Sequence, residues 1–162
     1  LMEGYLQMAA EAVKRFPGVP THIFLQAGVG GLAGAVAAYA RTVWGKAPKI
    51  IVVEPEAAAA LQASIEAGHS VVAAGPDSIM GRLDCKEPSL IALNGLARDA
   101  DLFLTLSDAQ VEAQLGALRD AGFATTASGG AGVAAVLDAQ ARAAVGLGPE
   151  ARVLTFLSEM PE

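Results

Sequence analysis

The sequence predicts an α/β fold, a three-layer αβα arrangement around a mostly parallel sheet, in a single domain of residues 1–162. Short apolar runs alternate with helical stretches along the chain, which is typical of parallel strands joined by crossover helices. Each run is apolar at consecutive positions, as in strands that are covered on both faces. Hydrophobic residues make up 53% of the chain and aromatic ones only 5%, so small side chains are expected to fill the core.

The expected elements follow one another in a regular order. A helix from about Glu3 to Phe16 is predicted by its apolar spacing, and Pro17-Gly18 ends it. Strands are expected at 22–26, 49–54, 102–106 and 153–157; helices are expected from the glycine-rich turn to about 44, at 57–67, at 89–97, from a cap at 107 or 108 to 121, and at 129–145. The stretch 71–88 is loop-like and longer than an ordinary connection, which indicates a functional role.

Charge and cysteine usage exclude several classes of protein. The formal net charge is −6 and the charged residues are interspersed, so nucleic acid is a poor partner. No apolar stretch reaches the roughly 20 residues of a membrane span and no secretion signal is visible, so we expect a cytoplasmic protein with no membrane partner. Cys85 is the single cysteine, which permits neither an internal disulfide nor a clustered-thiolate zinc site.

A glycine-rich turn follows the strand expected at 22–26 and opens the next helix. Gly28, Gly30 and Gly31 lack a Cβ, so an anion can approach the main chain closely. Unpaired N–H groups at the start of the helix attract negative charge, and the turn lies at the carboxyl edge of the sheet, where α/β folds bind ligands. The turn therefore predicts a phosphate-binding site.

The local pattern leaves the ligand of this turn open. Gly28-x-Gly30-x-x-Ala33 matches the dinucleotide pattern, and Glu54 ends the next strand at about the spacing where an acid meets the ribose of NAD. A tight turn that only packs the helix on the sheet would need no ligand. No Lys-Ser/Thr pair follows the glycines, which excludes a P-loop. His22, His69 and Ser128 lie in no catalytic motif.

Five segments resemble a family of enzymes. Thr21–Leu32, with the sequence THIFLQAGVGGL, resembles the phosphate loop of fold-type II pyridoxal-phosphate enzymes, the tryptophan synthase β superfamily. Val52–Glu56, with the sequence VVEPE, resembles the next strand–helix unit of threonine dehydratases and their relatives, which implies that Glu54 ends a strand and binds no ribose. Ser78–Ser89, with the sequence SIMGRLDCKEPS, is similar to a stretch of the diaminopropionate ammonia-lyases and narrows the resemblance to them. Ser128–Gly132 resembles their Ser-Gly-Ala-x-Gly helix start, and Leu157–Glu159 resembles the end of their last strand.

The resemblance implies a cofactor, pyridoxal 5'-phosphate, and a small amino-acid substrate. The implied cofactor-binding residues are Gly28, Val29, Gly30, Gly31, Leu32, Gly81 and Ser158. The main chain of 28–32 would hold the phosphate, Ser158 would hydrogen-bond the pyridine nitrogen, and Gly81 would lie beside the ring. The implied reaction is the α,β-elimination of 2,3-diaminopropionate to pyruvate and ammonia. The alternatives are a threonine or serine dehydratase, which shares every feature except 81–89, an NAD(P)-binding domain, and a non-catalytic module descended from the enzyme.

Two departures from the family pattern limit these expectations. Ala127 stands where many relatives carry a glutamate, so an acid near the cofactor is expected to be missing. The family's Schiff-base lysine lies in a Ser/Asn-x-Lys motif upstream of the phosphate loop, and no lysine here lies in such a motif; the lysines are Lys14, Lys46, Lys49 and Lys86, the last expected to be solvated. We therefore expect a C-terminal fragment of a longer two-domain enzyme, inactive by itself, with an exposed former interface that favours a homo-oligomer, in the simplest case a dimer.

Overall fold

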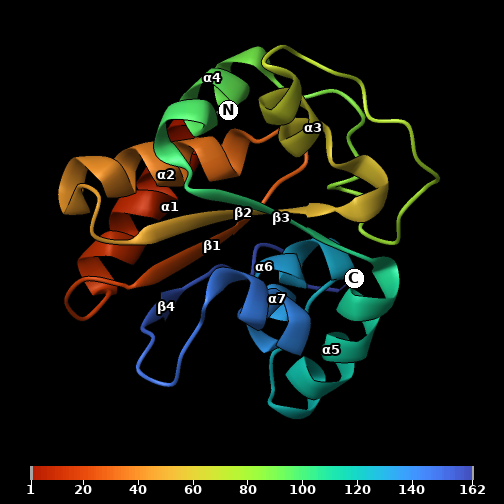
Figure 1. The fold of residues 1–162 in the computed structure, drawn as a ribbon. Helices are drawn as coiled ribbons and strands as arrows, with labels where there is room; N and C mark the ends of the chain where they lie inside the picture. Colours follow the sequence, from red (N-terminus) through yellow and green to blue (C-terminus); the bar gives the residue numbers. More distant parts are fainter. Residues whose placement is uncertain (1, 162) are drawn as a thin grey trace.

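The protein, described by a computed structural model over residues 2–161, is built on one four-stranded parallel sheet (Figure 1). The strands lie in the order β3-β2-β1-β4. Their bounds are β1 His22–Gln26, β2 Lys49–Pro55, β3 Leu102–Leu106 and β4 Val153–Leu154. All three neighbouring pairs are parallel, which confirms the predicted α/β class.

Helices cover both faces of the sheet and complete three layers (Figure 1). The helices α1 to α4 lie on one face, and α5 to α7 lie on the other. Their bounds are α1 Met2–Arg15, α2 Gly31–Trp44, α3 Ala60–Ala67, α4 Leu90–Asp99, α5 Asp108–Asp120, α6 Ala127–Leu137 and α7 Ala139–Val145, with a short 3-10 helix η1 at Glu56–Ala58 before α3.

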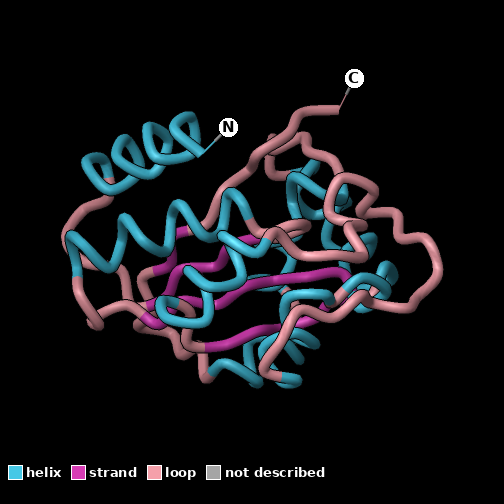
Figure 2. Tube along the Cα trace, turned by 90° about the horizontal axis from the view of Figure 1, so that it is seen from above, coloured by secondary structure: helices cyan, strands magenta, loops and turns pink. Residues whose placement is uncertain are grey.

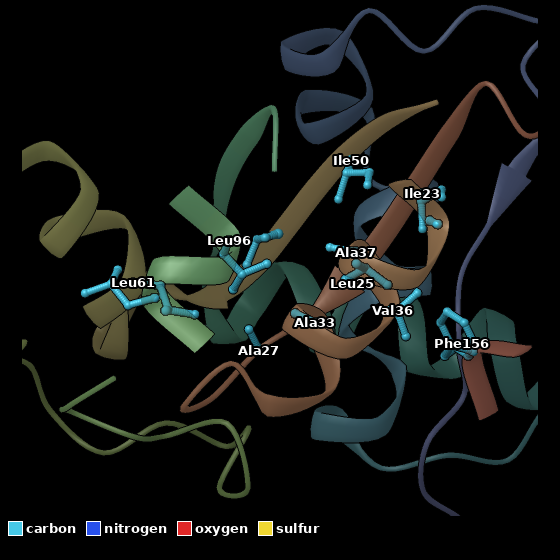
Figure 3. Packing of buried hydrophobic residues seen from close by; sticks show 14 residues of the cluster. Ile23, Leu25, Ala27, Ala33, Val36, Ala37, Ile50, Leu61, Leu96 and Phe156 are labelled. Atoms are coloured by element: carbon cyan, nitrogen blue, oxygen red, sulfur yellow. The ribbon is translucent and has the colours of Figure 1, made fainter. Parts of the chain in front are cut away.

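Successive residues of the central strands enter two different cores, because side chains alternate between the faces of a strand. Ile23 and Leu25 of β1 pack with Val36 of α2 on the first face (Figure 3). Phe24, between them in sequence, packs with Ile51 of β2 against α6 and α7 on the second face. Burial on both faces is the reason why the central residues of these strands, Ile23–Leu25 and Ile50–Val53, are apolar at consecutive positions.

Three element boundaries differ from the predicted ones. The helix predicted at 129–145 is two helices, because Asp138 leaves the helical conformation and its carboxylate accepts the Ala141 N–H at 2.8 Å as the cap of α7. The helix predicted at 57–67 starts as the 3-10 turn η1 and becomes α-helical only at Ala60. The strand expected at 153–157 pairs with β1 only over Val153–Leu154.

The long connection 68–89 between α3 and α4 has no helix or strand (pink in Figure 2), and a partly buried ion pair helps to hold it in place. Lys86 Nζ donates to the carbonyls of Ala57 at 2.9 Å and Pro76 at 2.8 Å and pairs with Asp84. The expectation of a solvated Lys86 is wrong, because its ammonium group donates hydrogen bonds to all three of these partners and only 29% of the side chain is exposed.

Two further observations concern the whole described chain. None of the helices between residues 2 and 161 combines the length and apolar character that crossing a bilayer requires. Within the same residues, no three His, Cys, Asp or Glu side chains come together as a group that could hold a metal ion.

Candidate functional site

A cavity of about 680 Å³ opens at the carboxyl end of β1. The ladder ends where the Ala27 N–H donates to Val53 O at 2.9 Å, and the chain then turns into α2. Six of the seven predicted cofactor-binding residues line this one cavity: Gly28, Val29, Gly30, Gly31, Leu32 and Ser158. The fold therefore brings together the glycine-rich turn and a hydroxyl from the distant C-terminal segment.

The turn offers the cavity several unpaired backbone donors. Gly30 precedes α2 with a φ of 95° and supplies no side-chain cap. Among the residues that the structure describes, none accepts a hydrogen bond from the N–H of Val29, Gly31 or Leu32. The first turn of α2 carries no acidic residue, so the helix dipole is not compensated there. A phosphate group fits this place, since its oxygens can accept several N–H groups at once.

Because Gly28 and Gly30 have no Cβ, two other parts of the chain can pack closely against the turn. A Cβ on Gly28 would lie 2.9 Å from Cys85 Sγ and 3.0 Å from Arg82 O. A Cβ on Gly30 would lie 2.9 Å from Ala92 Cβ of α4. The segment 82–85 and α4 thus close around the turn, and only glycine leaves room for them.

A side chain of α1 completes the wall on the other side, and sequence reasoning missed it. Tyr5 lines the cavity, and its Cε2 atom lies 3.5 Å from the point where a Cβ on Gly31 would stand. The helical spacing of α1 places Tyr5, but nothing in the local sequence indicates that it meets the phosphate loop.

An ion pair stands at the rim of the cavity. Arg82 Nε lies 3.1 Å from Glu159 Oε1, and the Thr126 hydroxyl donates to Glu159 Oε2 at 2.6 Å. The Thr125 hydroxyl also donates to the Glu159 carbonyl, at 2.8 Å, so the residue is fixed at both side chain and main chain. The expectation that the site lacks an acid because position 127 is alanine is therefore wrong. Glu159 supplies one from a segment that only the fold brings near α6.

Glu54 lies at the carboxyl end of β2 but is closed off from the cavity. It is fully buried, and its two carboxylate oxygens accept the N–H groups of Leu61 and Gln62, each at 2.8 Å. Burial raises the pKa of Glu54 to about 7, against the opposing effect of these two hydrogen bonds. The Glu54 side chain thus caps the start of α3 and does not line the cavity, so it cannot contact a ribose there, which argues against the NAD alternative.

Gly81 and the lysines lie outside the cavity. Gly81 lines an adjoining hollow with Ser128 and Thr126, and Arg82 and Glu159 form the wall between the two spaces. Its place beside a cofactor ring stays a prediction. None of the lysines in the described part of the chain lines the cavity, and Lys49, for example, is the first residue of β2 and donates to Val145 O at 3.2 Å.

The fold and this site define a class of protein, and comparison with known families agrees. Residues 1–159 match the family described as "Pyridoxal-phosphate dependent enzyme", and the chain belongs to that family. The match confirms pyridoxal 5'-phosphate as the cofactor of the family, and the free donors of the turn fit its phosphate.

Within this family the chain is similar to the diaminopropionate ammonia-lyases. It is 34% identical to that of Salmonella typhimurium and 39% identical to that of Escherichia coli K12, each over 116 residues, 67% of this chain and 29% and 28% of the relatives. The crystal structure of the Escherichia coli diaminopropionate ammonia-lyase, in complex with an aminoacrylate-PLP azomethine reaction intermediate, superposes with a TM-score of 0.87 and 28% identity, over 98% of this chain and 44% of that one. Threonine deaminase isoform 2 from Solanum lycopersicum shares the fold, with a TM-score of 0.88 and 20% identity over 99% of this chain and 46% of that one. The chain thus spans less than half the length of these relatives.

Proposed function

We propose that the chain is the cofactor-phosphate-binding part of an ammonia-lyase of the diaminopropionate type. The observation that carries the proposal is one cavity lined both by the glycine-rich turn, with the unpaired N–H groups of Val29, Gly31 and Leu32, and by Ser158. A phosphorylated pyridine needs these two kinds of contact: an anion-binding site for its phosphate group and a hydrogen-bond partner for its ring nitrogen.

Each group of the chain then has a definite task. Pyridoxal 5'-phosphate, when bound, would supply an electron sink for the α-carbon of an amino-acid substrate. The turn 28–32 anchors the phosphate through backbone donors, which positions the ring without taking part in proton transfer. Ser158 orients the ring at its nitrogen, and the segment 82–85 shields the phosphate from water by packing over Gly28.

The charges at the rim support an amino-acid substrate. The Arg82 guanidinium, which is largely exposed, can bind a substrate carboxylate, and the Glu159 carboxylate beside it can attract an ammonium group. Diaminopropionate carries one carboxylate and two amino groups, so its elimination to pyruvate and ammonia fits this pair. Superposition gives 28% identity with the Escherichia coli diaminopropionate ammonia-lyase and 20% with the threonine deaminase, which favours diaminopropionate over threonine as the substrate.

The same cavity supports the proposal that the 162-residue chain has no elimination activity by itself. The cavity walls in the described chain contain no lysine, so nothing in them can bind the cofactor covalently. Borohydride reduction of the chain with pyridoxal 5'-phosphate, followed by peptide mass spectrometry, tests this point. We expect no specifically modified lysine, and stoichiometric modification of one lysine together with turnover would contradict the proposal.

Binding of phosphorylated ligands tests the site itself. We expect pyridoxine 5'-phosphate to bind more tightly than pyridoxine, and NAD not to bind, in isothermal titration calorimetry. The variant Gly31→Asp should lose at least about ten-fold in affinity, because a carboxylate would take the donors and repel the phosphate. Gly31→Ala is the matched control, since a Cβ at this position meets only Tyr5 at an ordinary 3.5 Å. Equal affinity of the two variants for pyridoxine 5'-phosphate would refute the proposal that the turn 28–32 binds the phosphate group.

We also propose that the chain self-associates. Leu90 and Ile91, at the start of α4, are 63% and 70% exposed, and large apolar side chains of this kind favour contact with another surface. Sedimentation velocity over a wide concentration range should show a dimer, and a strictly monomeric species at high concentration would contradict this proposal.

A further inference from the structure

Gln26 is a buried amide at the end of β1 that joins the C-terminal segment to α6. It is 2% exposed. Its Nε2 atom lies 3.1 Å from each of three oxygens: the carbonyl of Gly129, the carbonyl of Phe156 and the hydroxyl of Ser158. These partners lie more than a hundred residues from Gln26 in sequence, so one side chain holds three distant positions together.

The two carbonyls determine which end of the amide faces Ser158. A carbonyl oxygen only accepts hydrogen bonds, so the amide nitrogen, and not the amide oxygen, must face Gly129 and Phe156. An amide nitrogen only donates. The Ser158 hydroxyl therefore receives a shared N–H from Gln26 and cannot direct its own proton at it.

The proton of Ser158 is consequently free for the cavity, which Ser158 lines. Its backbone N–H is already used by the Gly129 carbonyl at 3.3 Å, which fixes the residue next to the amide. A hydroxyl held in this way donates to a ligand atom that carries a lone pair. A pyridine nitrogen has such a lone pair only in its unprotonated form.

We propose that Gln26 is a positioning residue that makes Ser158 a hydrogen-bond donor and so keeps the pyridine nitrogen of the bound cofactor unprotonated. The inference rests on the proposed function, because it needs the pyridine ring to lie at Ser158. Gln26 acts through Ser158, although both residues line the cavity.

The surroundings of Gln26 match the nitrogen end of its amide, whereas Oε1 accepts no hydrogen bond from the residues that the structure describes. A Cβ on Gly132 would lie 2.7 Å from Gln26 Oε1, so the glycine leaves the space that the amide oxygen fills. A glutamate at position 26 would turn a charged oxygen toward the two carbonyls, and an apolar side chain would leave them without donors. Only a neutral donor of this length serves both carbonyls and the hydroxyl.

Nuclear magnetic resonance with ring-¹⁵N pyridoxine 5'-phosphate tests the proposal in the 162-residue chain. The ring ¹⁵N shift separates a protonated nitrogen from an unprotonated one that accepts a hydrogen bond. We expect the second form in the wild-type chain, a partly protonated nitrogen in Gln26→Met, and the same in Ser158→Ala. Affinity should fall roughly five-fold in each variant, and the double variant should lose no more than either single one. Inorganic phosphate should bind all four proteins equally.

The possible results separate the inference from the function on which it rests. Failure of the wild-type chain to bind either pyridoxine 5'-phosphate or inorganic phosphate would overturn both. The inference alone would be overturned if the ligand binds but the protonation of its ring nitrogen is the same in the wild-type chain and in Gln26→Met. It would also be overturned if the affinity losses of the two single variants add up in the double variant. If Gln26→Met does not fold, the wild-type chain and the variant at the exposed Ser158 still decide: a protonated ring nitrogen in the wild-type complex refutes the assignment.

Discussion

Replacement of Gly30 by alanine should destabilise the fold for two reasons that can be measured separately. The residue has a φ of 95°, a conformation that costs an L-residue about 1–2 kcal/mol. Its new Cβ would also lie 2.9 Å from Ala92 Cβ and 3.2 Å from Leu61 Cδ1. The Leu61 methyl can rotate away, but the Ala92 Cβ is fixed to the backbone of α4, so overpacking adds about 1–3 kcal/mol. We expect a total loss of about 2–5 kcal/mol in the free energy of unfolding.

A double-mutant cycle with Ala92→Gly distinguishes the two contributions. Ala92→Gly should itself cost about 1 kcal/mol, because glycine is a poor helix former. In the Ala92→Gly background, Gly30→Ala should lower the free energy of unfolding only by the cost of its positive φ. The coupling energy between the two substitutions should therefore be about 1 kcal/mol or more. Urea unfolding, followed both by circular dichroism and by the fluorescence of Trp44, measures each value and checks that the transitions coincide.

Gly34→Ala is the matched control for this cycle. Gly34 lies in α2 near the same residue of α4, but a Cβ there would lie 3.6 Å from Ala92 Cα, an ordinary contact. This variant should be neutral or stabilise the protein by up to about 1 kcal/mol. The reasoning is refuted if Gly30→Ala and Gly34→Ala unfold within about 0.5 kcal/mol of each other, or if the cycle shows no coupling.

Three further outcomes follow from single contacts. Burial raises the pKa of Glu54 to about 7, so as the pH rises from about 4.5 the unfolded chain releases this proton before the folded chain does. The free energy of unfolding of the wild type should therefore fall by on the order of 3 kcal/mol relative to Glu54→Gln by pH 7. Urea unfolding across this pH range measures the difference, and parallel stability curves for the two proteins would contradict the prediction. Lys86→Met removes the hydrogen bonds that hold the connection 68–89, so proteolysis within this connection should be faster in Lys86→Met than in the control Lys46→Met. Equal cleavage rates in the two variants would show that Lys86 does not hold the connection. Asp138→Ala should cost about 1 kcal/mol of unfolding free energy through the lost cap of α7, and an unchanged urea midpoint would rule the cap out.

The elements with local signals could be predicted from the sequence. The strand at 22–26 matches β1, because a run of apolar residues that ends in a glycine-rich turn has few other conformations. The glycine-rich turn before α2 was likewise predictable, since the identity of a glycine reports local backbone geometry. Where two local signals competed, prediction failed: Asp138 sits in an apolar helical pattern, and only its capping bond to Ala141 shows that the helix restarts there.

The rest of the site depends on contacts between distant residues. Gln26 meets Ser158 across 132 positions, and Arg82 meets Glu159 at the rim of the same cavity. Such contacts leave no periodic trace in the sequence, because the strand order and the path of the C-terminal segment beside β1 create them. The same reason explains Glu54, whose place in the sequence fits a ribose ligand while its surroundings in the fold make it a helix cap. The sequence by itself thus determined the layers, the glycine-rich turn that opens α2 and the family. The tertiary structure decided which side chains face that turn, because burial and hydrogen-bond partners exist only once the chain has folded.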